Sequence, residues 1–193
     1  RSKSLAKLCE KLEATKKRLL MISLVANFMR NLEADEVEPA VSMILGRSFP
    51  KWSQKTLEVS WTTLNELIKR ITKADWKLFM EAFGKTGDVG SATKILFENS
   101  KGGKQSTLFE RELTIMEVRR SLEAIAEVAG FGSREKKERI IEALLSLASP
   151  LEAKYLIKIF IGEMRTGFYE GLMEQAVSEA FQIPVEIVQK DRK

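Results

Sequence analysis

The segment 149–162 contains the local signals of an α-helix from its start to its end. Ser149 suits the N-cap, Pro150 suits the first helical position, where a missing N–H is harmless, and Glu152 completes a capping box. Apolar residues then recur at helical spacing, at Tyr155, Leu156, Ile159 and Phe160. The sequence therefore predicts a helix that buries one face and ends at Gly162.

Similar patterns recur along the 193 residues, a length that suits one domain or two small ones. Capping boxes are expected at Asp35 with Glu38 and at Thr114 with Glu117, and single caps at Asp88 and Ser133. Glycines are expected to end helices at Gly46, Gly84 and Gly130. No segment shows the apolar/polar alternation of a half-buried strand. We therefore expect an all-α, compact multi-helix domain.

A faint internal repeat is also present. Residues 41–46 resemble residues 157–162 at an offset of 116 residues. The separation between the expected caps, Asp35 and Ser149, is two residues shorter than this offset. One interpretation is a pair of pseudo-two-fold-related halves, at about residues 5–100 and 110–190. The alternative is a chance likeness between amphipathic helices.

Composition excludes several classes of chemistry. The chain has 32 Lys and Arg against 27 Asp and Glu, and it has no His, which excludes His-based catalysis and His metal ligands. Cys9 is the only cysteine, so an intrachain disulfide and a zinc cluster are excluded, and an intracellular, reducing compartment is expected. The basic excess favours an anionic partner.

The basic residues 16–18 followed by the apolar stretch 19–29 imitate part of a signal peptide. This stretch is too short to span a bilayer, so we expect a buried helix and no membrane association. The chain begins without Met and stops within an expected helix, which suggests a fragment of a longer protein.

No complete active site is evident, and we predict neither catalytic nor metal-binding residues. The segment Gly84-Lys85-Thr86 resembles the end of a phosphate-binding P-loop, but that motif needs a glycine where this chain has Phe79. No nucleophile is accompanied by a plausible base.

Three turns have features that suit phosphate binding: 86–90, 132–137 and 165–167. The first two combine glycines with the start of an expected helix, where unpaired amides attract anions. The third places an arginine and a threonine before a glycine. A glycine before a helix is commonly just a turn, and Lys136 with Lys137 is commonly a solvated face. Together, the three turns favour binding to the nucleic-acid backbone without base reading.

Several motifs occur in the order found in one known family. They are Gly46-Arg47-x-Phe49-Pro50, Lys85 to Gly90, Leu113-Thr114, Gly132-Ser133-x-x-Lys136-Lys137, Ser149 to Leu156, and Gly162 to Gly167. Across nearly its whole length, the chain resembles the N-terminal DNA-binding domain of ATP-dependent DNA ligases of the archaeal and eukaryotic replicative type. Residues 1–193 would form that one domain.

The resemblance implies a monomeric helical domain of two pseudo-symmetric halves that grips nicked duplex DNA through phosphates across the minor groove. The DNA-binding residues that it implies are Gly87, Asp88, Gly90, Ser133, Lys136, Arg165, Thr166 and Gly167. The loop with Gln105, Leu108 and Phe109 resembles a sliding-clamp-binding motif, the alternative being that its apolar residues pack against the domain.

The chain departs from the family in three respects. It lacks the catalytic Lys-x-Asp-Gly motif, so ATP and Mg2+ would serve the full-length ligase, and this chain alone should be inactive. It has Thr166 where an apolar residue is common, and residues 58–60 replace a Gly-Val-Gly turn, so no DNA contact is expected there. The alternative function is a helical protein-interaction module without nucleic-acid binding. The compartment implied is the cytoplasm or nucleoid, or the nucleus in a eukaryote.

Overall fold

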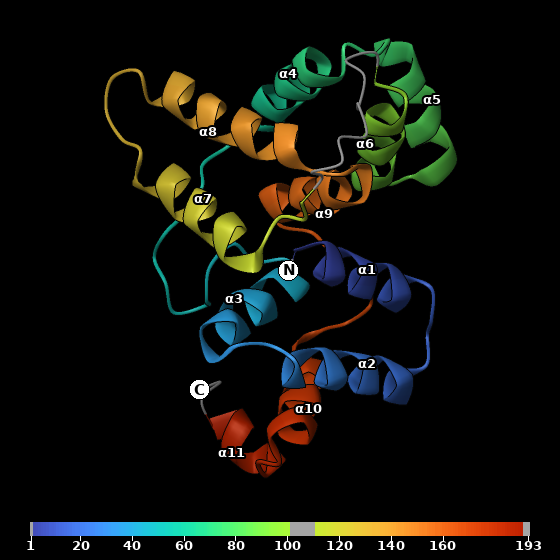
Figure 1. Cartoon of the computed structure of the whole chain (residues 1–193), viewed down its shortest axis with the longest axis vertical. Helices are drawn as coiled ribbons and strands as arrows, with labels where there is room; N and C mark the ends of the chain where they lie inside the picture. Colours follow the sequence, from blue (N-terminus) through green and yellow to red (C-terminus); the bar gives the residue numbers. More distant parts are fainter. Residues whose placement is uncertain (1, 101–110, 191–193) are drawn as a thin grey trace.

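The computed structural model describes residues 2–100 and 111–190, and its regular structure there is entirely α-helical (Figure 1). The all-α prediction is therefore confirmed for the described residues. The helices are α1 (Ser2–Glu13), α2 (Arg18–Arg30), α3 (Ala34–Ile44), α4 (Trp61–Thr72), α5 (Trp76–Thr86), α6 (Val89–Glu98), α7 (Ile115–Glu127), α8 (Ser133–Leu147), α9 (Pro150–Ile161), α10 (Glu170–Phe181) and α11 (Val185–Lys190).

Helix α9 lies at the centre of the molecule (Figure 1). Every residue from Glu152 to Phe160 is buried, so α9 is covered on all sides rather than on the single face that its spacing predicts. Helix α6 packs along it most extensively, and α1 packs against another side. A helix enclosed in this way must also bury its polar residues, here Glu152, Lys154 and Lys158.

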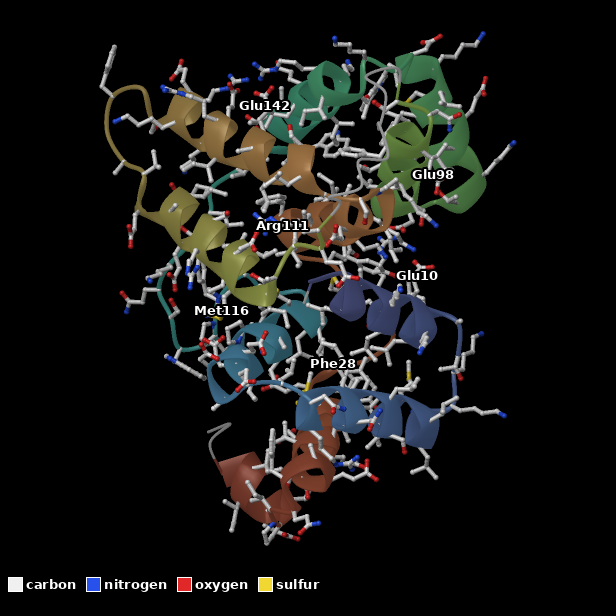
Figure 2. All side chains as sticks on the ribbon, viewed as in Figure 1. Glu10, Phe28, Glu98, Arg111, Met116 and Glu142 are labelled. Carbon is white, nitrogen blue, oxygen red and sulfur yellow. The ribbon has the colours of Figure 1, made fainter. Side chains whose placement is uncertain are left out.

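The other helices pack around this centre in pairs. Helix α10 packs along α2, α5 along α6, and α8 against both α7 and α4. Side chains fill the spaces between the ribbons and form one continuous apolar core that extends from α1 to α10 (Figure 2). None of the described helices is long and apolar enough to cross a membrane.

Three of the predicted helix starts are confirmed. The Ser149 hydroxyl accepts from the Glu152 amide at 3.2 Å, and Glu152 accepts in return from the Ser149 amide at 2.9 Å. Thr114 and Asp88 also cap their helices by accepting amide hydrogen bonds. The second half of the Thr114 capping box is absent, because the Glu117 carboxylate binds Arg111 at 2.6 Å instead.

The predicted cap of α3 is wrong. Glu33, not Asp35, is the N-cap, and its partner in the capping box is Glu36. Glu38 is unavailable for capping because it forms a bidentate ion pair with Arg119 of α7, at 2.9 and 2.6 Å, which joins the two helices.

Three other predicted boundaries are also wrong. Helix α7 ends at Glu127 with Val128 as its C-cap, two residues before the predicted end at Gly130. Helix α8 has Gly132 as its N-cap, with φ +75°, and Ser133 is its first helical residue. Helix α5 continues through Gly84 and ends at Gly87, with φ +63°. A glycine is tolerated within a helix, whereas the left-handed position that ends α5 favours one strongly.

Helices α3 and α9 start at equivalent positions of the internal repeat. Glu33 and Ser149 are the N-caps, and each closes a capping box with the residue three positions later. The offset between these caps is 116 residues, the same as between residues 46 and 162. The two-residue mismatch expected from Asp35 is therefore absent.

The same two helices also end alike. Gly46 and Gly162 have φ values of +79° and +85°. The closing hydrogen bonds correspond one to one: Gly46 N to Met43 O, Arg47 N to Ser42 O, Gly162 N to Ile159 O, and Glu163 N to Lys158 O. This local match agrees with a repeat, while the two-fold relation between whole halves stays a prediction.

Candidate nucleic-acid interface

The turn between α5 and α6 is held by its own side chains. The Thr86 hydroxyl donates to the Ala82 carbonyl oxygen at 2.8 Å and lies 3.3 Å from the Asp88 amide nitrogen, which donates to it. Gly87 is exposed, and nothing lies within 4 Å of the position that a β-carbon would take there. The backbone at Gly87 is therefore open to a large ligand.

Helix α6 begins directly after this turn. The Asp88 carboxylate accepts from the amide and the hydroxyl of Ser91 and so caps the helix. Among the described residues, the amides of Val89 and Gly90 have no hydrogen-bond acceptor. Unpaired amides at a helix N-terminus carry partial positive charge, so this end of α6 attracts an anion.

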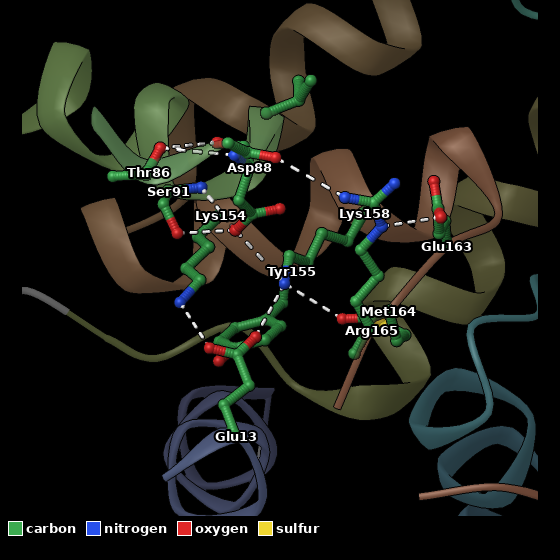
Figure 3. A network of polar contacts seen from close by, with 12 residues as sticks. Glu13, Thr86, Asp88, Ser91, Lys154, Tyr155, Lys158, Glu163, Met164 and Arg165 are labelled. Carbon is green, nitrogen blue, oxygen red and sulfur yellow. Dashed lines mark hydrogen bonds and ion pairs between the residues drawn. The ribbon is translucent and has the colours of Figure 1, made fainter. Parts of the chain in front are cut away.

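The turn between α9 and α10 brings Arg165 to the same place (Figure 3). Arg165 adopts the left-handed region, with φ +53°. Its Nε donates to Glu163 at 2.7 Å, and its Nη1 lies 3.5 Å from the Gly87 carbonyl oxygen. The guanidinium remains 59% exposed. Two of the three predicted phosphate turns are therefore neighbours, although 78 residues separate them in sequence.

Thr166 and Gly167 shape the second turn from within. The Thr166 side chain is buried, and its hydroxyl accepts from the Phe168 amide at 3.3 Å. Gly167 has φ +77°, and a β-carbon there would lie 3.6 Å from the Met21 methyl group. Within residues 165–167, Arg165 presents an exposed side chain, and Thr166 holds the turn's shape.

An ion network built on two buried lysines lies beneath the two turns (Figure 3). The Lys158 Nζ is 2.6 Å from Glu13, 3.3 Å from Asp88 and 3.0 Å from the Met164 carbonyl oxygen. Lys154 binds Glu10 at 2.5 Å and Glu13 at 2.9 Å. Glu10 belongs to α1 (Figure 2), and its carboxylate joins that helix to Lys154 of α9.

The network lowers the pKa of two carboxyl groups. Burial acts to raise the pKa of Glu10, but hydrogen bonds from Lys154 and Tyr155 outweigh it, and the pKa lies below its ordinary value. Burial likewise opposes ionisation of Asp88, but its bonds to Ser91 and its attraction to Lys158 leave its pKa lowered. Both groups are therefore held as carboxylates.

Gly90 has a packing role that the sequence does not reveal. A β-carbon there would lie 2.9 Å from the Lys154 carbonyl oxygen and 2.9 Å from Cγ and Cε of Lys158. The missing side chain lets α6 approach α9 closely. The Cα of Gly90 therefore faces α9, and the packing leaves Gly90 buried.

The third predicted turn lies apart from the other two. The start of α8 and the α5–α6 turn are at opposite sides of the view in Figure 1. Lys136 is exposed there, and Ser133 is the first residue of the helix. Lys137 is used within the fold, because its Nζ donates to the Leu57 carbonyl oxygen at 2.8 Å.

Lys154 and Lys158 are the residues that the sequence reasoning missed. The signal that could have revealed them is a pair of lysines four residues apart within an otherwise apolar helix. Gln105, Leu108 and Phe109 lie outside the described residues, so the structure does not place them.

The fold and these turns define a class: an all-helical domain whose helix ends present amides and an arginine at neighbouring points. The family model described as "DNA ligase N terminus" matches residues 1–178, and the chain belongs to this family. It is 35% identical over 184 residues to a DNA ligase of Methanoculleus marisnigri, which covers 95% of this chain and 33% of that protein. It is 34% identical over 188 residues to a DNA ligase of Methanopyrus kandleri, with coverages of 97% and 33%.

A DNA ligase of Archaeoglobus fulgidus is 31% identical over 186 residues, which cover 96% of this chain. The chain thus spans about a third of the length of these curated relatives. The resemblance noted from the sequence motifs is therefore confirmed at the level of the family.

Proposed function

We propose that this chain is the DNA-binding domain of an ATP-dependent DNA ligase and that it binds nicked duplex DNA through backbone phosphates. The observation that carries the proposal is the meeting of Arg165 with the α5–α6 turn. An exposed guanidinium lies 3.5 Å from the Gly87 carbonyl oxygen, directly beside the unpaired amides at the start of α6. A phosphate is the ligand that such a group of donors suits best.

The proposed contacts differ in kind. Arg165 would bind phosphate through its guanidinium, Gly87 would contribute exposed backbone, and Gly90, which is buried, would contribute only the unpaired amide at the start of α6. The Asp88 carboxylate repels anions, so its part is to cap α6 and leave the amides of the next two residues free. Because these donors do not read base edges, they support binding that does not depend on sequence.

The start of α8 supplies a second contact in this proposal. Lys136 and Ser133 would bind phosphate away from the first site, so that the domain spans the minor groove on both sides of a nick. This spacing supports contacts at two separate points along the duplex rather than in one pocket.

The remaining parts of the ligase would perform the chemistry. The Lys-x-Asp-Gly motif is absent from this chain, and the relatives are about three times as long. In this proposal ATP and Mg2+ serve those other parts, this chain positions the nick, and the ligase acts inside the cell. We also propose, from the sequence motif alone, that Gln105, Leu108 and Phe109 contact a sliding clamp.

Fluorescence anisotropy with a labelled nicked duplex, repeated over a series of salt concentrations, tests the DNA proposal. We expect micromolar or tighter binding at low salt, with a log–log slope equivalent to several released counterions. Failure to bind at low salt would contradict the proposal and would favour a protein-interaction module.

A further inference from the structure

Lys158 is a buried cation bonded to three separate segments of the chain. Its side chain is 4% exposed, and its Nζ contacts Glu13 of α1, Asp88 at the start of α6 and the Met164 carbonyl oxygen. Asp88 belongs to one of the two neighbouring turns, and Met164 directly precedes Arg165 in the other. A single ammonium group therefore ties both turns to α9 (Figure 3).

We infer that Lys158 is a positioning residue for DNA binding: it holds the α5–α6 turn and the Arg165 turn at the spacing that one phosphate requires. This inference rests on the proposed function. Lys158 is too buried to touch DNA, so its effect must pass through Asp88 and Met164.

The path of the side chain supports this role. The stem of Lys158 crosses the face of Gly90, where a β-carbon would lie 2.9 Å from its Cγ and Cε. The close approach of α6 fixes the stem, and the three acceptors fix the ammonium group. A buried charge with fully determined geometry has little freedom to let either turn shift.

Lys154 provides a matched control on the same helix. It is also buried, and its ammonium binds Glu10 and Glu13 of α1. Among the described residues, it has no hydrogen bond or ion pair with either turn. Lys154→Met and Lys158→Met thus each remove a buried cation paired with α1, and only the second also removes the link between the turns.

Amide hydrogen exchange tests the coupling without DNA. In Lys158→Met we expect exchange at residues 86–91 and 163–168 to be faster by about tenfold or more, while Lys154→Met leaves these segments within about twofold of the wild type. Unchanged exchange in Lys158→Met, or equal acceleration in both variants, would overturn the inference.

DNA binding supplies the second readout. We expect Lys158→Met to weaken binding to a nicked duplex by about tenfold and Lys154→Met by less than about twofold. Adding Lys158→Met to Arg165→Ala should cause little further loss, because both changes act on the same contact. Fully additive losses would show that Lys158 does not act through Arg165.

A third variant covers the case in which Lys158→Met does not fold. Asp88→Asn keeps a residue able to cap α6 and removes the ion pair. We expect Asp88→Asn to accelerate amide exchange at residues 163–168, in the opposite turn, and an unchanged exchange rate there would overturn the inference.

The two proposals fail separately. If the wild-type chain does not bind DNA, the proposed function fails, and the exchange data still decide whether Lys158 couples the turns.

Discussion

The backbone of Gly90 lies so close to Lys158 that a β-carbon on the glycine would be 2.9 Å from Cγ and Cε of the lysine. The same β-carbon would lie 2.9 Å from the backbone oxygen of Lys154, which cannot move aside as a flexible side chain can. The missing side chain at position 90 therefore sets the distance between α6 and the central helix α9.

Gly90→Ala should accordingly destabilise the domain by about 1–3 kcal/mol, the usual range for overpacking. Urea denaturation measures this change. Gly84→Ala is the matched control, because Gly84 lies within α5 with nothing within 4 Å of its β-carbon position. That change should stabilise the domain by about 0.5–1 kcal/mol, since alanine favours the helix. Equal effects at the two positions would contradict the packing role of Gly90.

Arg165→Ala should weaken binding to all duplex sequences about equally, by about tenfold, because one charge-assisted contact to a phosphate is lost. The salt dependence should fall by about 0.9 in log–log slope, the value for one phosphate. Anisotropy on two duplexes of different sequence measures both quantities. Arg30→Ala is a suitable control, since Arg30 is exposed at the end of α2, outside every turn to which the proposal assigns a DNA contact. A loss confined to one sequence would indicate base reading instead.

Glu152→Ala should be among the more destabilising single changes, at about 2–4 kcal/mol. The buried carboxylate accepts from the amides of Ser149 at 2.9 Å and Leu113 at 3.1 Å, and both would lose their partner. Ser149→Ala, which removes only the cap, should cost about 1 kcal/mol. Chemical denaturation separates the two values, and a Glu152→Ala effect no larger than that of Ser149→Ala would show that the bond to Leu113 contributes little.

Acid should destabilise the domain through its lowered carboxyl pKa values. The folded-state pKa of Glu10 lies below its ordinary value of 4.5, and that of Asp88 lies below its ordinary value of 3.8. The two carboxylates therefore contribute their full stabilisation at pH values above these ordinary pKa values. This stabilisation is lost as the pH falls through the lowered folded-state values.

Thermal unfolding between about pH 7 and about pH 3 checks this, and Glu10→Gln should make the decline shallower. Glu127→Gln, an exposed position at the end of α7, should leave the decline unchanged. An equally steep decline in Glu10→Gln would exclude Glu10 as a source of the acid sensitivity.

Local signals were sufficient to predict most helices. The cap at Ser149, the proline at position 150 and the glycine at position 162 act within one turn of the chain, so neighbouring residues alone determine the boundaries of α9. The prediction for α3 failed where a distant residue competed for the same group, whereas the end of α5 and the start of α8 were misplaced by a few residues because a nearby glycine adopts the left-handed conformation. Glu38 was assigned to a cap, but its carboxylate binds Arg119 of another helix, 81 residues away.

The candidate site divides in the same way. The sequence identified the turn with Gly87 at the start of α6 and the turn with Arg165 as two separate features, because glycines and caps are local signals. Only the tertiary structure decided that the two turns meet, that Gly90 faces α9, and that Lys158 lies beneath them both. Those relations depend on the packing of α6 against α9 and on the burial of charges between α1 and α9, and no short stretch of sequence records which helices pack together.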